Sequence, residues 1–288
     1  MKSREELIDD LLTLSFAEDV GDGDATTLST IPAEEMGRQR LIVKEEGILA
    51  GVEVARMVFD KFDPSLKMTV YIHDGAHVKP GDIAFEVEGP VRSLLQTERV
   101  MLNIMQRMSG IATTTARYQA KLEGLATKVL DTRKTTPGMR LLEKDAVKIG
   151  GGENHRIGLF DMILIKDNHV DFAGGIHNAV ESARKWCREN GKDLKIEVET
   201  RNEEEIRQAL AENVDRIMLD NFTPERTAGA VKIIREDDAR NGRHTEIESS
   251  GGITIDTLRA YGETGVDFIS VGALTHSVKG LDMSFKAF

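Results

Sequence analysis

The sequence predicts an α/β protein whose C-terminal part is a parallel β/α barrel, open or missing some of its units. Three observations lead to this fold class. After residue 125, short apolar segments suited to buried strands recur, each of them ends in polar residues, and helical patterns separate most of them. A doubly wound parallel sheet is the alternative. The six predicted strands are residues 128–134, 162–169, 195–200, 216–221, 246–252 and 268–273.

The segments between these strands carry the apolar spacing of helices that cover a sheet. The clearest helical patterns are residues 175–190, 203–212 and 224–236. Repetition of strand, polar end and helix is typical of βαβ units, whose strands are parallel.

The N-terminal part has a different texture and predicts a β-rich scaffold. Residues 38–49 and 68–90 are short strand patterns divided by Gly and Pro turns. The second segment resembles the hairpins of lipoyl- and biotinyl-carrier modules, but it lacks their modified-lysine motif. The charged segment 1–12 predicts an amphipathic helix and not a signal peptide.

A long helix is predicted for residues 92–123, which have a broad apolar face. Ser109 and Gly110 lie within it, and we expect this pair to interrupt the helix and to mark a domain boundary. The predicted domains are therefore residues 1–109 and residues 110–276.

Composition narrows the class of protein. The chain has 288 residues, 40% of them hydrophobic and 30% charged, which suits one large or two moderate globular domains. No apolar run approaches the roughly 18–20 residues of a membrane helix. The single cysteine, Cys187, lies beside Trp186 in a polar helical stretch; it cannot form an internal disulfide, so we expect a bystander thiol and a cytoplasmic protein. A net charge of -11 disfavours nucleic-acid binding through a broad basic face, but a local positive field can still bind small anions.

The predicted strands end in residues able to do chemistry. In a β/α barrel the active site lies at the carboxyl ends of the strands, so these side chains are expected to gather at one edge. In chain order they are Asp131, Arg133 and Lys134; Lys166, Asp167, Asn168 and His169; Glu197 and Glu199; Asp220 and Asn221; Ser249, Ser250, Gly251 and Gly252; and Gly272 and Ala273.

Cations concentrate at this edge. Arg133, Lys134, Arg156 and Lys166 indicate a highly anionic ligand, because the planar guanidinium donates two parallel hydrogen bonds to a carboxylate or phosphate. His155 precedes one of the arginines. Ordinary salt bridges to nearby acids are the alternative.

Glycines follow the last two strands. Gly251 and Gly252 lie in an SSGG segment, and Gly272 lies in VGALTHS. Glycine allows backbone N–H groups to approach an oxyanion, and a following helix N-terminus adds a favourable dipole. Barrels of this kind often bind phosphate there. Turn geometry alone is the alternative.

Two carboxylates, Glu199 and Asp220, end neighbouring strands. Near phosphates such a pair favours Mg²⁺, which prefers oxygen ligands. The same groups could instead bond ribose hydroxyls or stabilise a positive sugar centre. The segment 21–27 (GDGDATT) is not an EF-hand loop, and we expect its Asp residues to cap a turn.

These residues resemble the quinolinate phosphoribosyltransferase family. The resemblance runs from near residue 20 to near residue 277, and the segment 131–170 is its most specific part. Asp145 stands where an aromatic residue is expected. The other matching segments are GDGDATT, TERVMLNIMQRMSGIAT at 97–113, IEVET at 196–200, MLDNF at 218–222, SSGGI at 249–253 and VGALTHS at 271–277.

The resemblance implies an N-terminal α/β sandwich followed by an open, incomplete α/β barrel, with residues from about 277 to 288 returning to the first domain. It also implies a homodimer or larger assembly with shared active sites. In such an assembly Arg99 would reach into the partner subunit's site and bind quinolinate.

Residue roles follow from the same resemblance. Arg133, His155 and Arg156 would join Arg99 in holding the two carboxylates of quinolinate. Lys134 and Lys166 would lie between the substrates, while Glu199 and Asp220 would serve the ribose and the metal-assisted pyrophosphate. The 5′-phosphate would lie against Ser250, Gly251, Gly252, Gly272 and Ala273, with His276 close by.

The implied reaction joins quinolinate to phosphoribosyl pyrophosphate with Mg²⁺ and releases nicotinate mononucleotide, pyrophosphate and CO₂. Three other functions fit parts of the sequence. One is a class I aldolase with a Schiff base on Lys166, which leaves the arginines unexplained. The others are a related transferase for a different anionic acceptor, and a sensor of phosphoribosyl metabolites without turnover.

Overall fold

The computed structural model describes residues 2–288, and these form two compact units that interleave along the chain. The sheet unit contains residues up to Ala116, residues 134–151 and residues 273–288; the barrel unit contains residues 117–133 and 152–272. The predicted division at residues 109 and 110 stays a prediction. None of the helices described combines the length and the apolar character that a membrane crossing needs.

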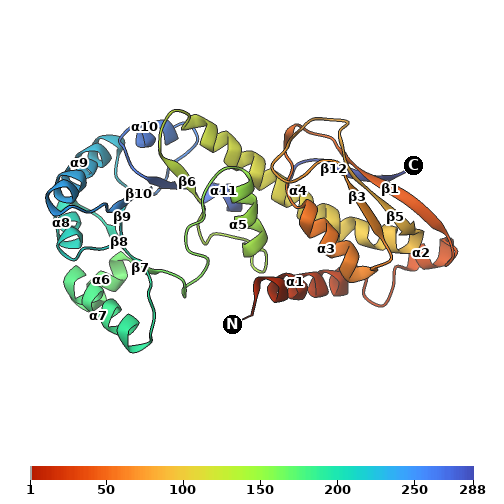
Figure 1. Cartoon of the computed structure of the whole chain (residues 1–288), viewed down its shortest axis with the longest axis horizontal. Coiled ribbons are helices and arrows are strands. Elements are labelled where there is room, and N and C mark those ends of the chain that lie inside the picture. Colours follow the sequence, from red (N-terminus) through yellow and green to blue (C-terminus); the bar gives the residue numbers. More distant parts are fainter. Residues whose placement is uncertain (1) are drawn as a thin grey trace. The chain divides into compact units, whose positions relative to one another are not determined.

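The sheet unit is built on a four-stranded antiparallel sheet in the order β12-β1-β5-β3. Its strands are β1 (Met36–Val43), β3 (Lys67–Val70), β5 (Ile83–Pro90) and β12 (Met283–Ala287). Figure 1 shows α3 (Val52–Phe62) and the long helix α4 (Val91–Lys121) beside this sheet. The last strand of the chain therefore pairs with the first, and the C-terminus lies within the sheet unit.

Three aromatic side chains form the centre of this unit. Phe59 of α3 lies 6.2 Å from Phe85 of β5 and 6.0 Å from Phe285 of β12, measured between ring centroids. All three are buried, so they join one helix to two strands far apart in the sequence. The unit also contains a short two-stranded sheet of β2 (Gly47–Ile48) and β4 (His77–Val78).

Two helices precede the sheet. The predicted N-terminal helix is present as α1 (Arg4–Asp19), whose first turn is closed by a capping box between Ser3 and Glu6. Asp24 caps α2 (Ala25–Thr30), accepting hydrogen bonds from the N–H groups of Thr26 and Thr27. This confirms that the GDGDATT segment uses an aspartate as a cap.

Helix α4 is continuous through Ser109 and Gly110, so the predicted interruption is wrong. Both residues instead allow other segments of the chain to pack closely against α4. The Ser109 hydroxyl accepts from the Ala50 N–H at 2.9 Å and donates to the Ala50 carbonyl at 3.0 Å. A side chain at Gly110 would lie 2.3 Å from the carbonyl oxygen of Lys279. A small residue in a helix can thus mark a crossing segment where no break occurs.

The barrel unit holds a six-stranded parallel sheet in the order β6-β11-β10-β9-β8-β7. All six predicted strands are present. They are β6 (Lys128–Leu130), β7 (Ile163–Ile165), β8 (Ile196–Thr200), β9 (Arg216–Asp220), β10 (Glu246–Ser250) and β11 (Phe268–Ser270).

This strand order decides between a barrel and a doubly wound sheet. From β7 to β11 the strands follow chain order in one direction, and β6 then lies beside β11. A doubly wound sheet reverses direction at a switch point, whereas a barrel keeps winding. Within residues 2–288 no ladder joins β6 to β7, so the barrel is open there. Helices α6 (Asp167–Ala173), α7 (Ile176–Glu189), α8 (Glu203–Ala211), α9 (Pro224–Asn241) and α10 (Leu258–Gly262) follow the strands (Figure 1).

Candidate active site

The carboxyl edge of the barrel sheet brings together a lysine and two carboxylates from three successive strands. Lys166 follows β7, Glu199 lies in β8, and Asp220 ends β9. The Lys166 Nζ lies 2.7 Å from Oε2 of Glu199, whose side chain is only 10% exposed. In the parallel register, Ser250 of β10 lies opposite Asp220. The strand ends therefore meet at one edge.

The backbone of Lys166 is fixed where α6 begins. Its N–H donates to Nδ1 of His169 at 2.9 Å, which closes the first turn of the helix. The side chain of Lys166 remains 44% exposed. An anchored backbone with an accessible ammonium suits a group that must meet a ligand.

Asp220 lies in an acidic environment. Burial first, and then the negative charge of Glu199, raise the pKa of the Asp220 carboxyl. Asn221 opposes this effect, because its Nδ2 donates to Oδ2 of Asp220 at 2.7 Å. Two carboxylates that repel one another are a natural place for a hard cation or for hydroxyl donors.

Two guanidinium groups influence one another in the same unit. Partial burial, and then the positive charge of Arg133, lower the pKa of Arg156. Both arginines come from loops next to β6: Arg133 follows it, and the loop of Arg156 joins it through a parallel bridge between Leu130 and Glu153. A bound dianion would relieve this repulsion.

His155 lies buried beneath Arg156, with both ring nitrogens next to other groups. Its Nδ1 accepts from the Arg156 backbone N–H at 2.7 Å, and its Nε2 lies 3.0 Å from Oε2 of Glu197. Its own backbone N–H donates to Asp131 at 2.9 Å. The loop that carries Arg156 is thus tied to the barrel interior.

The barrel interior contains two carboxyl groups that sequence reasoning did not weigh together, Glu197 and Glu248. Burial raises the pKa of Glu197 to about 7. Burial, and then the charge of Glu197, raise the pKa of Glu248 to about 7. Arg216 of β9 offsets them, with Nη1 3.2 Å from Oε2 of Glu248. The sequence carried a signal for them, because glutamates alternate with apolar residues in β8 and β10 and so lie on one face of each strand.

His155, Glu197 and Glu248 have the spacing of a metal site, since one ligand atom from each lies within 4.8 Å of the others. The hydrogen bonds argue against this use. A histidine that binds metal through Nε2 carries its proton on Nδ1 and donates it to a second group. Here Nδ1 of His155 is an acceptor, so Nε2 holds the proton and faces Glu197. We interpret the cluster as a buried support for the loop, which His155 ties down through its hydrogen bonds with Arg156 and Asp131.

The glycine loop after β10 has the conformation that only glycine adopts easily. Gly251 has φ +100° and Gly252 has φ +64°. A Cβ on Gly251 would lie 2.2 Å from Oδ1 of Asn221, whose own N–H donates to the Ser250 carbonyl at 2.8 Å. Helix α10 begins only at Leu258. No helix therefore begins directly after Gly252, and the helix dipole expected there is missing. Of the two glycine loops, the one with Gly272 is followed at once by a helix, α11 (Ala273–His276).

The remaining predicted residues lie in the sheet unit. Lys134 and Ala273 follow Arg133 and Gly272 directly in the chain. The Thr275 hydroxyl donates to the Lys134 carbonyl at 2.9 Å, so the segments of Lys134 and His276 adjoin. His276 is exposed. Arg99 is exposed on α4.

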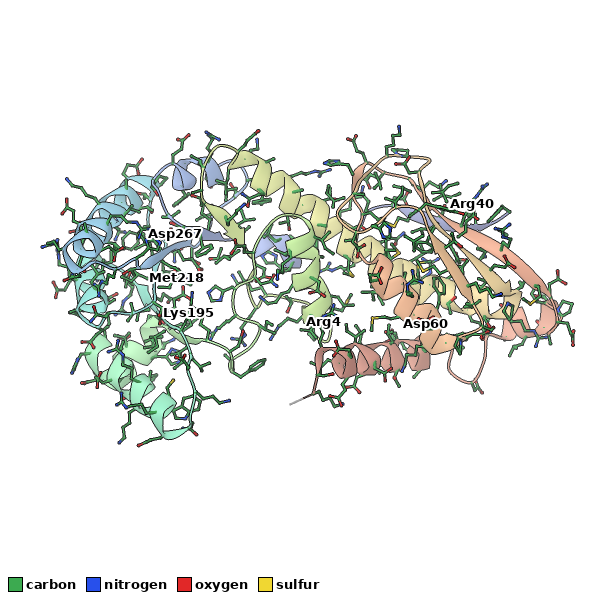
Figure 2. The ribbon with its side chains drawn as sticks, viewed as in Figure 1. Arg4, Arg40, Asp60, Lys195, Met218 and Asp267 are labelled. Carbon is green, nitrogen blue, oxygen red and sulfur yellow. The ribbon has the colours of Figure 1, made fainter. Side chains whose placement is uncertain are left out.

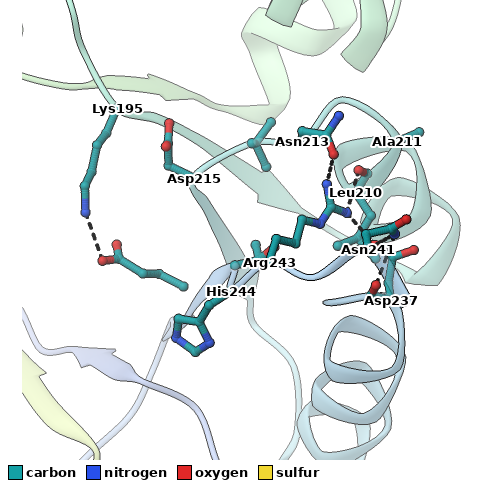
Figure 3. A pocket seen from close by; sticks show the side chains of 12 residues that line it. Lys195, Leu210, Ala211, Asn213, Asp215, Asp237, Asn241, Arg243 and His244 are labelled. Atoms are coloured by element: carbon teal, nitrogen blue, oxygen red, sulfur yellow. Dashed lines mark hydrogen bonds and ion pairs between the residues drawn. The ribbon is translucent and has the colours of Figure 1, made fainter. Parts of the chain in front are cut away.

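A cavity of about 850 Å³ lies at the opposite edge of the barrel, where the strands begin (Figure 3). Its cations already have partners: Lys195 lies 2.9 Å from Glu246, and Arg243 pairs with Asp237. Reactions in β/α barrels occur at the carboxyl edge, and features of the amino edge serve stability. We therefore expect substrates to bind at the carboxyl edge, where Lys166 and Glu199 lie.

Comparison with known proteins gives the family. A model of the quinolinate phosphoribosyl transferase N-terminal domain matches residues 24–109, and the model of the C-terminal domain matches residues 111–286. The chain belongs to the quinolinate phosphoribosyl transferase family.

Relatives cover the chain almost fully. It is 46% identical over 286 residues to the chloroplastic nicotinate-nucleotide pyrophosphorylase [carboxylating] of Oryza sativa subsp. japonica, covering 96% of this chain and 76% of the relative. It is 43% identical over 274 residues to a probable nicotinate-nucleotide pyrophosphorylase [carboxylating] of Bacillus subtilis, covering 95% and 91%. The nicotinate-nucleotide pyrophosphorylase structure from Francisella tularensis has a TM-score of 0.90 at 40% identity, covering 100% and 98%.

One departure from the family pattern has a local explanation. Asp145 of α5 (Arg140–Ile149), where an aromatic residue was expected, pairs with Arg4 of α1. Arg4 is labelled in Figure 2 at the start of that helix. The aspartate thus forms a surface ion pair with a residue outside the proposed site.

Proposed function

We propose that the chain transfers the phosphoribosyl group of phosphoribosyl pyrophosphate to quinolinate and releases nicotinate mononucleotide, pyrophosphate and CO₂. One observation carries the proposal. The barrel of this family carries two mutually repelling arginines, Arg133 and Arg156, on loops next to β6, and the Lys166–Glu199 pair at the carboxyl ends of β7 and β8. The names of the relatives support the same reaction.

Quinolinate has two adjacent carboxylates, which suit two guanidinium groups. Arg133 and Arg156 would each bind a carboxylate through the planar fork. His155 supports this pair, because its ring accepts the Arg156 backbone N–H. Arg99 would be supplied by a partner subunit, so we propose a homodimer or larger assembly. Holding the ring nitrogen towards the ribose is proximity catalysis.

At C1 of the ribose, the bond to pyrophosphate breaks as the pyridine nitrogen attacks. Negative charge grows on the leaving oxygen, and the Lys134 and Lys166 ammonium groups would offset it. Positive charge grows on the sugar ring, where the carboxylates of Glu199 and Asp220 would stabilise it. The short Lys166–Glu199 contact keeps both charges in place before the ligand arrives.

The same carboxylates fit Mg²⁺. Their oxygens are the ligands that this ion prefers. Burial first, and then repulsion from Glu199, raise the pKa of Asp220, and a cation would relieve that repulsion. When bound, the ion supplies positive charge to the pyrophosphate. Whether Glu199 or Asp220 would contact it directly, or through water, leaves the roles of the lysines unchanged.

Decarboxylation needs no nucleophile from the protein. Once the ring nitrogen is quaternary, the bond between C2 and its carboxylate breaks, CO₂ leaves, and N⁺ stabilises the electron pair left on C2. A proton from solvent then completes the product. The arginines' part is to hold the ring until this step.

The phosphate of the ribose would bind the loops after β10 and β11. Ser250 ends β10 and is followed by Gly251 and Gly252; Gly272 precedes α11, which begins at Ala273 and ends at His276. Positive φ at Gly251 and Gly252 turns the backbone sharply, and no side chain on either shields its N–H. We also propose a cytoplasmic location, which the single buried thiol of Cys187 supports.

The test is turnover by the purified chain with quinolinate, phosphoribosyl pyrophosphate and Mg²⁺. We expect nicotinate mononucleotide only when all three are present. Binding of either substrate without product would refute the transferase. Product from another pyridine or pyrimidine acid alone would replace quinolinate as the acceptor.

A class I aldolase is the weaker candidate. Lysines that form Schiff bases lie in apolar pockets or beside other cations, whereas Lys166 lies against a carboxylate. Borohydride with a carbonyl substrate should leave Lys166 unmodified, and a trapped adduct on it would favour the aldolase.

A further inference from the structure

A buried ion pair in the sheet unit lies next to two segments that carry proposed site residues. Arg107 of α4 donates through Nε and Nη2 to Oε1 of Glu143 in α5, at 3.0 and 2.9 Å. The Glu143 side chain is fully buried, and that of Arg107 is 26% exposed. Neither residue was singled out by the sequence, because Arg107 occupies one position of a long helix.

The first segment is the loop after Lys134. The Thr136 N–H donates to Oε2 of Glu143 at 3.2 Å, and Nη2 of Arg107 lies 3.2 Å from the Thr136 hydroxyl. This loop contains Pro137 and Gly138, which are exposed. Its position therefore depends on bonds to the ion pair more than on a core of its own.

The second segment is the single turn α11, which ends at His276. Nη2 of Arg107 donates to the Thr275 carbonyl, and the Thr275 hydroxyl donates to the carbonyl of Lys134 at 2.9 Å. Thr275 is fully buried. One guanidinium thus joins the Lys134 segment to the His276 segment, and Thr275 joins them directly.

We propose that Arg107 is a positioning residue for the phosphoribosyl donor. It fixes the distance between Lys134, assigned above to the pyrophosphate, and His276, assigned above to the 5′-phosphate. Both groups would bind the same molecule, so an error in their spacing weakens that substrate selectively. The inference rests on the proposed function.

The first test is Arg107→Lys. Lysine keeps the positive charge beside Glu143, but a point charge cannot donate in the fork geometry that reaches Glu143, Thr136 and Thr275 together. We expect the KM for phosphoribosyl pyrophosphate to rise about tenfold or more, as for the loss of one charged hydrogen bond. The KM for quinolinate should stay within about threefold.

Two further variants separate positioning from general stability. Thr275→Val removes only the hydroxyl that bonds Lys134, keeps the volume and leaves the buried ion pair intact, so it should raise the same KM in the same direction. Arg4→Ala is the matched control. This variant breaks a different ion pair to α5, the one between Arg4 and Asp145. Both of these side chains are part-exposed. It should change neither KM by more than about twofold.

A double-mutant cycle with Lys134→Ala completes the test, and it is measured as the Kd for phosphoribosyl pyrophosphate because Lys134→Ala alone is expected to be inactive. If Arg107 acts through Lys134, Arg107→Lys should cost much less in the Lys134→Ala background than in the wild type. Additive effects would overturn the proposal, as would equal changes in the two KM values for both Arg107→Lys and Thr275→Val. An inactive wild-type chain would instead refute the proposed function, which keeps the two failures distinct.

Discussion

The glycine loop after β10 offers a sharp test, because two adjacent glycines with positive φ differ in what an added side chain would meet. Gly251 and Gly252 both have positive φ. A Cβ on Gly252 meets nothing within 4 Å, whereas one on Gly251 would lie 2.2 Å from Oδ1 and 2.7 Å from Cγ of Asn221. Gly251→Ala must therefore move the Asn221 side chain, and Gly252→Ala need not.

The sizes of the two effects follow from these contacts. Left-handed backbone costs alanine roughly 1–2 kcal/mol at either position. Moving Asn221 also breaks its bond to Asp220, which is 2.7 Å long. A hydrogen bond to a charged group contributes about 1.5–3 kcal/mol, and less where it is part-exposed. Gly251→Ala should thus cost about 1–2 kcal/mol more than Gly252→Ala.

Urea unfolding of the two variants measures this difference, and Asn221→Ala tests its cause. Asn221→Ala removes the contacts with Oδ1 and Cγ and leaves only the 3.0 Å approach to the Asn221 backbone N, so Gly251→Ala in that background should lose most of its extra cost. Equal costs in the wild-type background, or an unchanged cost after Asn221→Ala, would refute the reasoning.

Three further predictions follow from the site. Arg133→Ala should raise the KM for quinolinate about 30-fold or more while the urea midpoint changes little, since a charged fork is lost from an exposed position; undiminished turnover at low quinolinate would contradict this role. Glu248 has a pKa raised from 4.5 to about 7, so its stabilising contribution is complete below pH 4.5 and is lost as pH rises through 7. Between pH 5 and pH 8, the wild type should therefore lose about 2 kcal/mol more of its free energy of unfolding than Glu248→Gln does. A difference between the two proteins that does not change with pH would contradict this prediction. Arg99→Ala and Lys134→Ala, each inactive alone, should recover about a quarter of wild-type activity when unfolded and refolded together in equal amounts, because half the dimers would be mixed with one intact site each; no recovery would exclude shared sites.

Much of the barrel could be predicted from the sequence. Buried parallel strands are apolar along their length, so each stands out from the helices, and polarity returns where the strand ends. That is why Lys166, Glu199 and Asp220 could be placed at one edge, and the strand order then brought Ser250 opposite Asp220.

The features that were missed depend on contacts distant in sequence. Ser109 and Gly110 predicted a break in α4, but α4 is continuous there. Their small size instead allows Ala50 and Lys279 to pack against the helix. Glu248 and Arg216 are charged residues inside strands, and only the three-dimensional pairing shows that they offset one another. The dipole expected after Gly252 was absent because Thr254–Thr257 form a turn before α10.

The most direct test of the account uses quinolinate labelled with ¹⁴C in the carboxylate at C2. The purified chain, with phosphoribosyl pyrophosphate and Mg²⁺, should release one ¹⁴CO₂ for each nicotinate mononucleotide formed, and Arg133→Ala should reduce both equally. Release of label without the nucleotide, or no release from folded protein that binds both substrates, would contradict the account.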